Sequence, residues 1–264
     1  MILFKNADVY APKHLGRRDV LVCGGRIEAV GETLEGGTGC RIIDASGKKL
    51  APGLIDRHVH VTGGGGEGSF HTRTPQIQLS SIIKAGITAV VGLLGTDDMS
   101  RTIEDLIAKI KGLKEEGISA YAFCGAYGVP SPTITGSIKK DIAFIDEILG
   151  LKLALSDHRA PNISTDELIR LASDVRTAGM ISGKCGCLVL HMGDGKKKLT
   201  PVFEALEETD LPVKIFQPTH INRNYDLFLD GIRLVKMGGT IDLTCEEFPQ
   251  GQIEGIQDPM IGLL

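Results

Sequence analysis

Residues 52–68 read "PGLIDRHVHVTGGGGEG", an apolar run that ends in two histidines and continues into four glycines and an acid. Side chains at positions i and i+2 of a β-strand point to the same face, so His58 and His60 are expected to approach one ion together. The glycines that follow allow the backbone to turn sharply around whatever is bound. The stretch therefore predicts a strand that ends at a metal site.

The sequence changes character at this stretch. Residues 1–50 contain short alternating runs separated by turns with Gly and Lys, which is typical of antiparallel strands, and they predict a small β-domain. Residues 51–245 alternate strand-like apolar runs with helical segments, the pattern of βα units around a parallel sheet. Residues 246–264 match neither pattern. We expect an α/β protein with a (β/α)₈ barrel and an incomplete, β-sandwich-like N-terminal domain.

The barrel prediction rests on seven strand-like runs with helix-like segments between them. The predicted strands are 53–60, 87–95, 118–127, 151–158, 186–194, 213–220 and 238–245. The predicted helices are 75–85, 101–116, 137–149, 164–179, 199–208 and 225–236. No convincing eighth strand and helix follow, so we expect the eighth βα unit to be absent and two strand edges to be exposed.

Composition excludes several classes of protein. The 264 residues are 42% hydrophobic, which suffices for a substantial core, and the net charge of -4 comes without the basic stripe that nucleic acid requires. The sequence contains no run of about 18 apolar residues and no pattern of a secretory signal, so we expect a cytoplasmic protein that binds no membrane.

The cysteines are expected to be reduced thiols. There are six in a chain without an export signal: Cys23, Cys40, Cys124, Cys185, Cys187 and Cys245. An alternative is a zinc site formed by Cys185, Cys187 and His191, but a C-x-C pair lacks the second pair of a structural zinc site.

Four histidines meet at one mouth if the strands form a barrel. His58 and His60 end the first strand, and His191 and His220 end the fifth and sixth. A single histidine is more often a core or loop residue, but several together suit zinc and hydrolysis. Lys152 lies inside an apolar run. Its position alone favours a side chain whose methylene groups pack against apolar neighbours while the amine reaches the rim of the barrel.

Six sequence blocks together resemble one known family. They read "PGLIDRHVHVTGGGGEG", "GLLGTD", "GAYGVPSPTITGS", "LALSDHRA", "HMGDGKK" and "PTHINRN", and the matching region extends from about residue 5 to residue 244. They look like the isoaspartyl dipeptidase branch of the amidohydrolase superfamily. The H-x-H pair is shared across the superfamily, whereas the "GGGGE", "SDHR" and "THINRN" blocks are more specific.

The resemblance implies a zinc-dependent hydrolase that cleaves β-aspartyl (isoaspartyl) dipeptides with a hydroxide bridging two Zn²⁺ ions. His58 and His60 would hold the more buried zinc, and His191 and His220 the other. Lys152 would react with carbon dioxide to give a carbamate that bridges the two metals.

The resemblance also implies roles in substrate binding. Glu67 would pair with the α-amino group of the substrate, and Arg159 and Arg223 offer planar forks for its carboxylates. Tyr127 would donate to the scissile carbonyl oxygen as negative charge develops on it. Two further residues would complete the pocket by hydrogen bonds, Thr96 and Gly65.

The match breaks near the end of the sequence. The family has an aspartate in an S-D-G turn after strand eight, which binds the more buried metal and transfers a proton, and neither Asp242 nor Asp258 matches that motif. Losing a general acid or base lowers the rate by about 10²- to 10⁴-fold. We therefore expect a shortened form of the family whose activity is reduced.

The same residues suggest three other interpretations. A dihydroorotase- or hydantoinase-like cyclic amidase would share the H-x-H pair and the lysine. A non-catalytic remnant would bind metal or self-associate through its open barrel edge, whereas an intact relative is expected to form homo-oligomers. A phosphate-binding loop is excluded because the glycines precede an acid where Lys-Ser/Thr is required.

Overall fold

The computed structural model describes residues 1–244 and divides the chain into two units, Met1–Leu54 and a second unit that begins at Ile55. The expected tail at 246–264, together with Cys245 and Asp258, lies outside the described residues.

The first unit is a five-stranded sheet in the order β3-β2-β1-β4, with β5 also pairing with β1. Its strands are β1 (Ile2–Tyr10), β2 (His14–Cys23), β3 (Arg26–Gly31), β4 (Arg41–Asp44) and β5 (Lys49–Leu50). The pairs β1–β2 and β2–β3 are antiparallel, as the sequence predicts, but β4 and β5 pair with β1 in parallel. The loop before β4 returns the chain to the start of β1, where the Arg41 amide donates to the Met1 carbonyl at 3.1 Å.

A small apolar cluster and one buried acid hold this sheet together. Ala7, Val9, Val20 and Ala45 are buried against one another. The Asp19 carboxylate is also buried and accepts hydrogen bonds from the backbone amides of Asn6 at 2.8 Å and Leu34 at 3.0 Å. These bonds satisfy the buried acid and fix the loop after β3 to the sheet.

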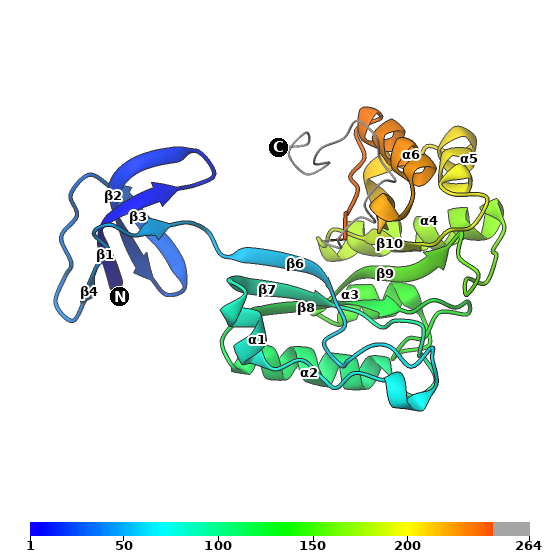
Figure 1. Ribbon diagram of the computed structural model, residues 1–264, viewed down its shortest axis with the longest axis horizontal. Coiled ribbons are helices and arrows are strands. Elements are labelled where there is room, and N and C mark those ends of the chain that lie inside the picture. The colour runs from blue at the N-terminus through cyan, green and yellow to red at the C-terminus, as the bar shows by residue number, and fades with distance from the viewer. Residues whose placement is uncertain (245–264) are drawn as a thin grey trace. The chain divides into compact units, whose positions relative to one another are not determined.

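The second unit is built on a six-stranded sheet in the order β11-β10-β9-β8-β7-β6. Figure 1 labels β6 to β10 of this sheet, and β11 pairs with β10 at its end. The strands are β6 (Leu54–Val59), β7 (Ile87–Gly92), β8 (Ser119–Gly125), β9 (Ile148–Leu155), β10 (Cys187–Met192) and β11 (Phe216–Thr219). The pairings from β7 to β11 are parallel. The α/β class and barrel-type arrangement expected from the sequence are confirmed for these six strands.

Helices connect successive strands, as the sequence predicts. They are α1 (Leu79–Lys84), α2 (Ile103–Glu115), α3 (Ile138–Phe144), α4 (Thr165–Ser182), α5 (Thr200–Glu208) and α6 (Tyr225–Lys236), with short 3-10 turns η1 (Phe70–Thr72), η2 (Val213–Ile215) and η3 (Ile221–Arg223). Ser164 caps α4 in a capping box with Glu167, which explains the sharp start of this helix. No helix within residues 1–244 has the length and apolar character needed to cross a membrane.

The two faces of the sheet carry different clusters. Leu153 and Leu155 of β9 belong to the main core together with Leu168 of α4. On the other face, Phe123 and Val189 form a smaller cluster with Val91, Leu93 and Cys187. Because side chains alternate along a strand, Lys152 on β9 and His191 on β10 project to the face opposite the helices.

The seventh predicted strand, 238–245, is not a strand in its described part. The Asp242 amide donates to the Pro218 carbonyl at 3.0 Å, and the Ile221 amide donates to the Asp242 carbonyl at 3.2 Å, so the segment runs beside the end of β11. His220 adopts a left-handed conformation with φ of 63°, which ends β11 at Thr219 and prevents a continuous ladder.

Truncating the core side of β9 should destabilise the second unit. Leu153 is fully buried, so Leu153→Ala is expected to reduce the free energy of unfolding by about 2–5 kcal/mol. Urea denaturation followed by circular dichroism measures this change. Ile181→Ala, at a side chain that is 78% exposed, is the control and should change stability by about 0.5 kcal/mol or less. Equal losses in the two variants would contradict the assignment of the core.

Candidate metal and substrate site

A lysine with no solvent exposure lies at the centre of the candidate site. Lys152 is 0% exposed, and its Nζ lies 3.3 Å from Nε2 of His58. It therefore does not reach the rim, which the spacing alone favoured. Burial lowers the pKa of its amine from 10.5 to about 7, while Asp242 opposes that shift. A substantial share of the amine is therefore neutral at neutral pH.

Four histidines from three strand ends surround this amine. The ring of His58 lies 5.7 Å from that of His60 and 5.0 Å from that of His220, measured between centroids. The rings of His191 and His220 are 4.8 Å apart. The structure thus brings together Lys152 and all four histidines that the sequence singled out.

Burial keeps the four imidazoles neutral. It lowers the pKa of His60 to about 4 and that of His220 to about 3, and the charge of Lys152 adds to both shifts. The same two causes lower the pKa values of His58 and His191. Neutral rings keep the nitrogen lone pairs that a metal ligand needs.

Two features of the rings suit metal binding. His60 Nδ1 lies 3.2 Å from the Leu93 carbonyl, and donation to that oxygen leaves the Nε2 lone pair free. His58 Nδ1 is buried and has no hydrogen-bond partner within the described residues. A buried unsatisfied nitrogen is rare, and a ligand to it would remove the penalty.

The rings do not form a closed ligand set as they stand. Among residues 1–244, no group of three His, Cys, Asp or Glu side chains is arranged to hold a metal ion. His58 Nε2 contacts the Lys152 amine, and His191 contacts Tyr127 and Asp157 instead. The imidazole nitrogens, their lack of charge and their closeness to one another suit metal binding. To bind an ion, His58 and His191 must exchange the contacts named above for contacts with the metal.

An arginine held between two acids lies beside the histidines. The Asp157 carboxylate accepts from Arg159 Nε at 2.8 Å and from Nη2 at 2.7 Å, and Glu67 accepts from Nη1 at 2.7 Å. Thr96 donates a short hydrogen bond to Glu67. That bond, together with Arg159, lowers the pKa of Glu67, so the acid stays ionised. The result is a fixed pair of opposite charges, with Glu67 partly exposed.

A buried tyrosine connects this ion pair with the histidines. The Tyr127 hydroxyl lies 2.8 Å from His191 Nδ1, and the Arg159 guanidinium lies 5.3 Å from the centre of the Tyr127 ring. Burial raises the pKa of Tyr127 to about 12. The hydroxyl therefore remains protonated and available as a hydrogen-bond donor.

The glycine loop is shaped by close backbone packing. Gly63 has φ of +88°, and a Cβ there would lie 2.2 Å from the Thr74 carbonyl oxygen. Gly65 has φ of +69°, and a Cβ there would lie 2.6 Å from the Thr72 carbonyl oxygen. The loop therefore depends on glycine for both conformation and space.

Two predicted site residues lie apart from the hydrogen-bonded cluster. Gly65 is fixed by the packing described above, and no hydrogen bond joins it to the cluster within residues 1–244. Arg223 is exposed in η3, three residues after His220, and its charge contributes to lowering the pKa of that histidine. It lies at the rim and makes no contact with the acids that hold Arg159 in the described structure.

The sequence patterns assign no role to two residues that help to hold the site together in the structure. Asp157 orients Arg159 and also lies 3.0 Å from His191 Nε2. Arg101 is buried, forms an ion pair with Asp97 at 2.9 Å, and donates to the carbonyl of Gly64 at 3.2 Å. The "SDHR" block contains a signal for Asp157, because an acid two residues before an arginine can fold back onto it. Arg101 gives no such signal in the sequence.

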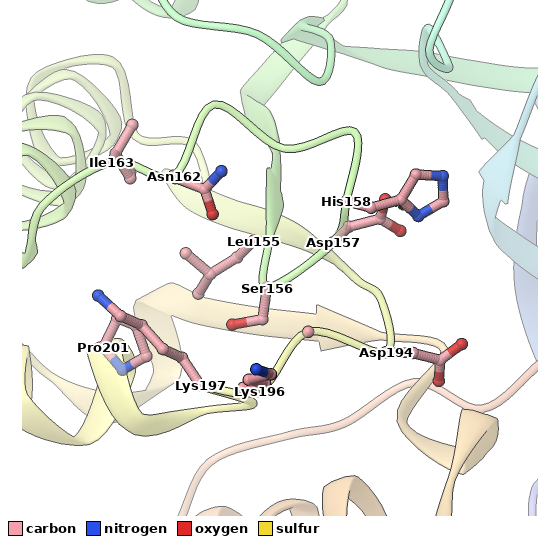
Figure 2. A pocket seen from close by; sticks show the side chains of 11 residues that line it. Leu155, Ser156, Asp157, His158, Asn162, Ile163, Asp194, Lys196, Lys197 and Pro201 are labelled. Atoms are coloured by element: carbon pink, nitrogen blue, oxygen red, sulfur yellow. Dashed lines mark ion pairs between the residues drawn. The ribbon is translucent and has the colours of Figure 1, made fainter.

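A cavity of about 460 Å³ lies between the loops that follow β9 and β10. Figure 2 shows side chains that line it, among them Ser156 and Asp157 from one loop and Lys196 and Lys197 from the other. It shares Asp157 with the candidate site, but the four histidines do not line it. The cavity therefore lies next to the histidine cluster and is separate from it.

No protein-family model matches the chain. Among solved structures, it is similar to a beta-aspartyl dipeptidase from Fervidobacterium islandicum AW-1, with 42% identity and a TM-score of 0.91 over 97% of this chain and 70% of that one. A structure of a beta-aspartyl dipeptidase from the same source, in complex with the beta-Asp-Leu dipeptide, shows 44% identity and a TM-score of 0.88 over 92% of this chain and 65% of that one.

Curated relatives include dihydroorotases. The protein from Listeria monocytogenes is 31% identical over 161 residues, which cover 58% of this chain and 37% of that protein. The protein from Lactobacillus johnsonii is 25% identical over 263 residues, which cover 94% of this chain and 59% of that protein. The chain thus spans between about a third and three fifths of the length of these relatives.

Removing the buried amine should change how stability depends on pH. The pKa of Lys152 is depressed by folding, so the unfolded chain binds more protons between pH 7 and the ordinary lysine value, and the free energy of unfolding should rise with pH in that window. One group contributes a slope of at most about 1.4 kcal/mol per pH unit. Lys152→Met should remove this contribution.

The measurement is urea denaturation between pH 7 and pH 10, in carbon-dioxide-free buffer with a chelator. Lys84→Met, at an exposed lysine, is the matched control and should retain the slope of the unmodified chain. If Lys152→Met shows that same slope, the folded chain keeps this amine protonated over the same pH range as the unfolded chain does, and the interpretation is wrong.

Proposed function

The chain belongs to the beta-aspartyl dipeptidase branch of the amidohydrolase superfamily, and from this premise we propose that it supplies the metal site and substrate site for hydrolysis of β-aspartyl dipeptides. The family resemblance expected from the sequence is confirmed by the similarity to solved beta-aspartyl dipeptidases. The observation that carries the functional proposal is the burial of Lys152 among four neutral imidazoles.

Lys152 is proposed to act as a carbamate. A neutral amine attacks carbon dioxide through its nitrogen lone pair, and the lowered pKa of Lys152 makes that form available near neutral pH. A nitrogen–carbon bond forms, the nitrogen releases one proton to solvent, and the product is an anion that lies among rings that have lone pairs to offer. Carbamate formation would therefore turn a buried amine into an anionic metal ligand.

The proposed ligands divide into two pairs. His58 and His60 would hold one zinc ion, His191 and His220 the other, with the Lys152 carbamate between them. When bound, the two ions would lower the pKa of a shared water enough to provide a nucleophile at neutral pH. The neutral imidazoles support this assignment, as does His58 Nδ1, which has no hydrogen-bond partner within residues 1–244.

Glu67 and Arg159 are proposed to recognise the aspartyl end of the substrate. A β-aspartyl dipeptide carries a free α-amino group and a free α-carboxylate on the same carbon. The adjacent carboxylate and guanidinium, 2.7 Å apart, match these two charges. Asp157 keeps Arg159 in place when Glu67 exchanges its partner for the substrate amine.

Tyr127 is proposed to donate to the scissile carbonyl oxygen. Its hydroxyl stays protonated, lies beside His191, and is buried where hydrogen bonds are strong. Asp242 does not fill the proton-transfer role that the resemblance gives to an aspartate after strand eight. Its carboxylate accepts from the Thr219 hydroxyl at 2.5 Å, and this bond fixes the segment after α6.

A cyclic amidase remains the second candidate, because curated dihydroorotases are among the relatives. Dihydroorotate carries a carboxylate but no free amine. Arg159 would find a partner in that substrate, whereas Glu67 would not. The presence of the ionised Glu67 beside Arg159 therefore favours the dipeptide.

The proposed activity predicts turnover of β-Asp-Leu in preference to dihydroorotate after the protein is supplied with zinc and bicarbonate. His191→Ala should abolish that turnover and reduce bound zinc, because it removes one ligand of the second ion. Mass spectrometry of the metal content and a ninhydrin assay of released amino acid measure the two effects separately. Hydrolysis of dihydroorotate alone would establish the cyclic amidase instead, and two bound zinc ions without any turnover would leave only a metal-binding role.

Substitutions at the ion pair test the recognition step. Glu67→Gln should raise KM for β-Asp-Leu by roughly tenfold or more, since a charge-assisted hydrogen bond contributes about 1.5–3 kcal/mol. Arg159→Lys should also raise KM, because lysine cannot form the bidentate contact with Asp157. Glu104→Gln, at an exposed acid on α2, is the matched control. Unchanged KM in both site variants would refute the assignment.

A further inference from the structure

Two cysteines lie side by side at the start of β10, in the segment that joins it to α4. The sulfur atoms of Cys185 and Cys187 are 3.4 Å apart, within hydrogen-bond distance. Cys185 is exposed and Cys187 is buried. His191 lies at the other end of the same strand, where it contacts Tyr127, so this pair is separate from the candidate hydrolytic site.

The backbone between α4 and β10 is held in a fixed shape. Lys184 Nζ donates to the carbonyls of Ile142 at 2.7 Å and Ile145 at 2.6 Å, and the Gly186 amide donates to the Leu149 carbonyl at 3.1 Å. Gly186 has φ of +54°, and a Cβ there would lie 2.7 Å from the Gly179 Cα. Glycine is therefore required between the cysteines, and the fixed backbone holds the two sulfur atoms close together.

The two thiols are electrostatically unequal. The hydrogen bond from Cys187 lowers the pKa of Cys185 below its ordinary value, whereas the same bond, together with burial, raises the pKa of Cys187. The exposed sulfur is therefore the one that ionises first, and its buried neighbour stays protonated beside it. A thiolate is the nucleophilic form of cysteine.

We propose that Cys185 and Cys187 form a redox-active dithiol that is oxidised reversibly to an intramolecular disulfide by small organic disulfides. Cys185 is the attacking thiolate, because it is exposed and hydrogen-bonded by its neighbour. Cys187 is the resolving thiol, because its sulfur is within reach and shielded from solvent.

The reaction is a pair of thiol–disulfide exchanges. The Cys185 thiolate attacks one sulfur of the organic disulfide, the S–S bond of that reagent breaks, and one thiolate leaves. Cys187 then loses its proton, attacks the Cys185 sulfur of the mixed disulfide, and expels the second thiol. Two electrons pass from the protein dithiol to the reagent, which is reduced to two thiols.

The second step is favoured by the loss of charge in the first. Once Cys185 is in the mixed disulfide, its negative charge no longer raises the pKa of Cys187. The remaining movement is small, since the sulfurs must close from 3.4 Å to about 2.05 Å. A zinc site at this pair is not supported, because no third His, Cys, Asp or Glu joins it in the part of the chain that the structure describes.

The test is to treat the full chain with glutathione disulfide, block free thiols with N-ethylmaleimide, and digest with trypsin. Cleavage after Lys184 and Lys196 releases one peptide, 185–196, that contains both cysteines and no others. The expected product is this peptide without glutathione or maleimide, lighter by two hydrogen atoms, and restored to two free thiols by dithiothreitol. A peptide that retains glutathione, or that carries two maleimides, would overturn the proposal.

Single substitutions distinguish the two roles. Cys187→Ser should stop the reaction at the mixed disulfide on Cys185, whereas Cys185→Ser should leave Cys187 unreacted. Cys23, exposed in the first unit, is the matched reference, and Cys185 should be alkylated roughly tenfold faster near pH 7 because of its lowered pKa. Equal alkylation rates, or an unreactive Cys185, would refute the assignment. These readouts do not depend on hydrolytic activity.

Discussion

The burial of the Lys152 amine is the constraint on which the candidate site depends. An ammonium ion without an opposite charge is strongly disfavoured in a protein interior, and the amine responds by losing its proton near neutral pH. The same desolvation acts on the surrounding imidazoles and keeps them neutral. A group of bases that would repel one another as cations can therefore lie together. Their nitrogen lone pairs are then available to bind a metal ion.

The parallel sheet explains how residues so far apart in sequence meet. His58, Lys152 and His191 come from β6, β9 and β10, and His220 follows β11. In a parallel sheet every strand ends on the same edge, so each strand delivers its side chain to one region. The loops then add the charges, since Asp157 and Arg159 follow β9 directly and Glu67 ends the glycine loop after β6.

The sequence was informative wherever a local pattern determines structure. The H-x-H pair and the alternation of strands and helices depend on neighbours in the chain, and the structure agrees with them. The parallel pairing of β4 and β5 with β1, and the loss of the seventh strand, depend on contacts with distant segments that no local pattern encodes. Arg159 shows the same limit, because its residue type predicts a carboxylate partner but not the choice of Asp157 and Glu67.

For the proposed function, the choice between a dipeptide and a cyclic amide would rest on loop charges, because one fold can serve enzymes with different substrates. A solved structure of a dihydroorotase has the same fold at 18% identity, so the sheet and its helices carry no preference for either substrate. The histidines and the lysine do not distinguish a dipeptide from a cyclic amide, because both reactions open an amide bond. The proposed role of the Glu67–Arg159 pair would discriminate, since only a substrate with an adjacent amine and carboxylate can satisfy both charges when it displaces their mutual contact. Under the proposed function, substrate choice would therefore follow from one acid at the end of a glycine loop, placed beside an arginine that Asp157 already holds.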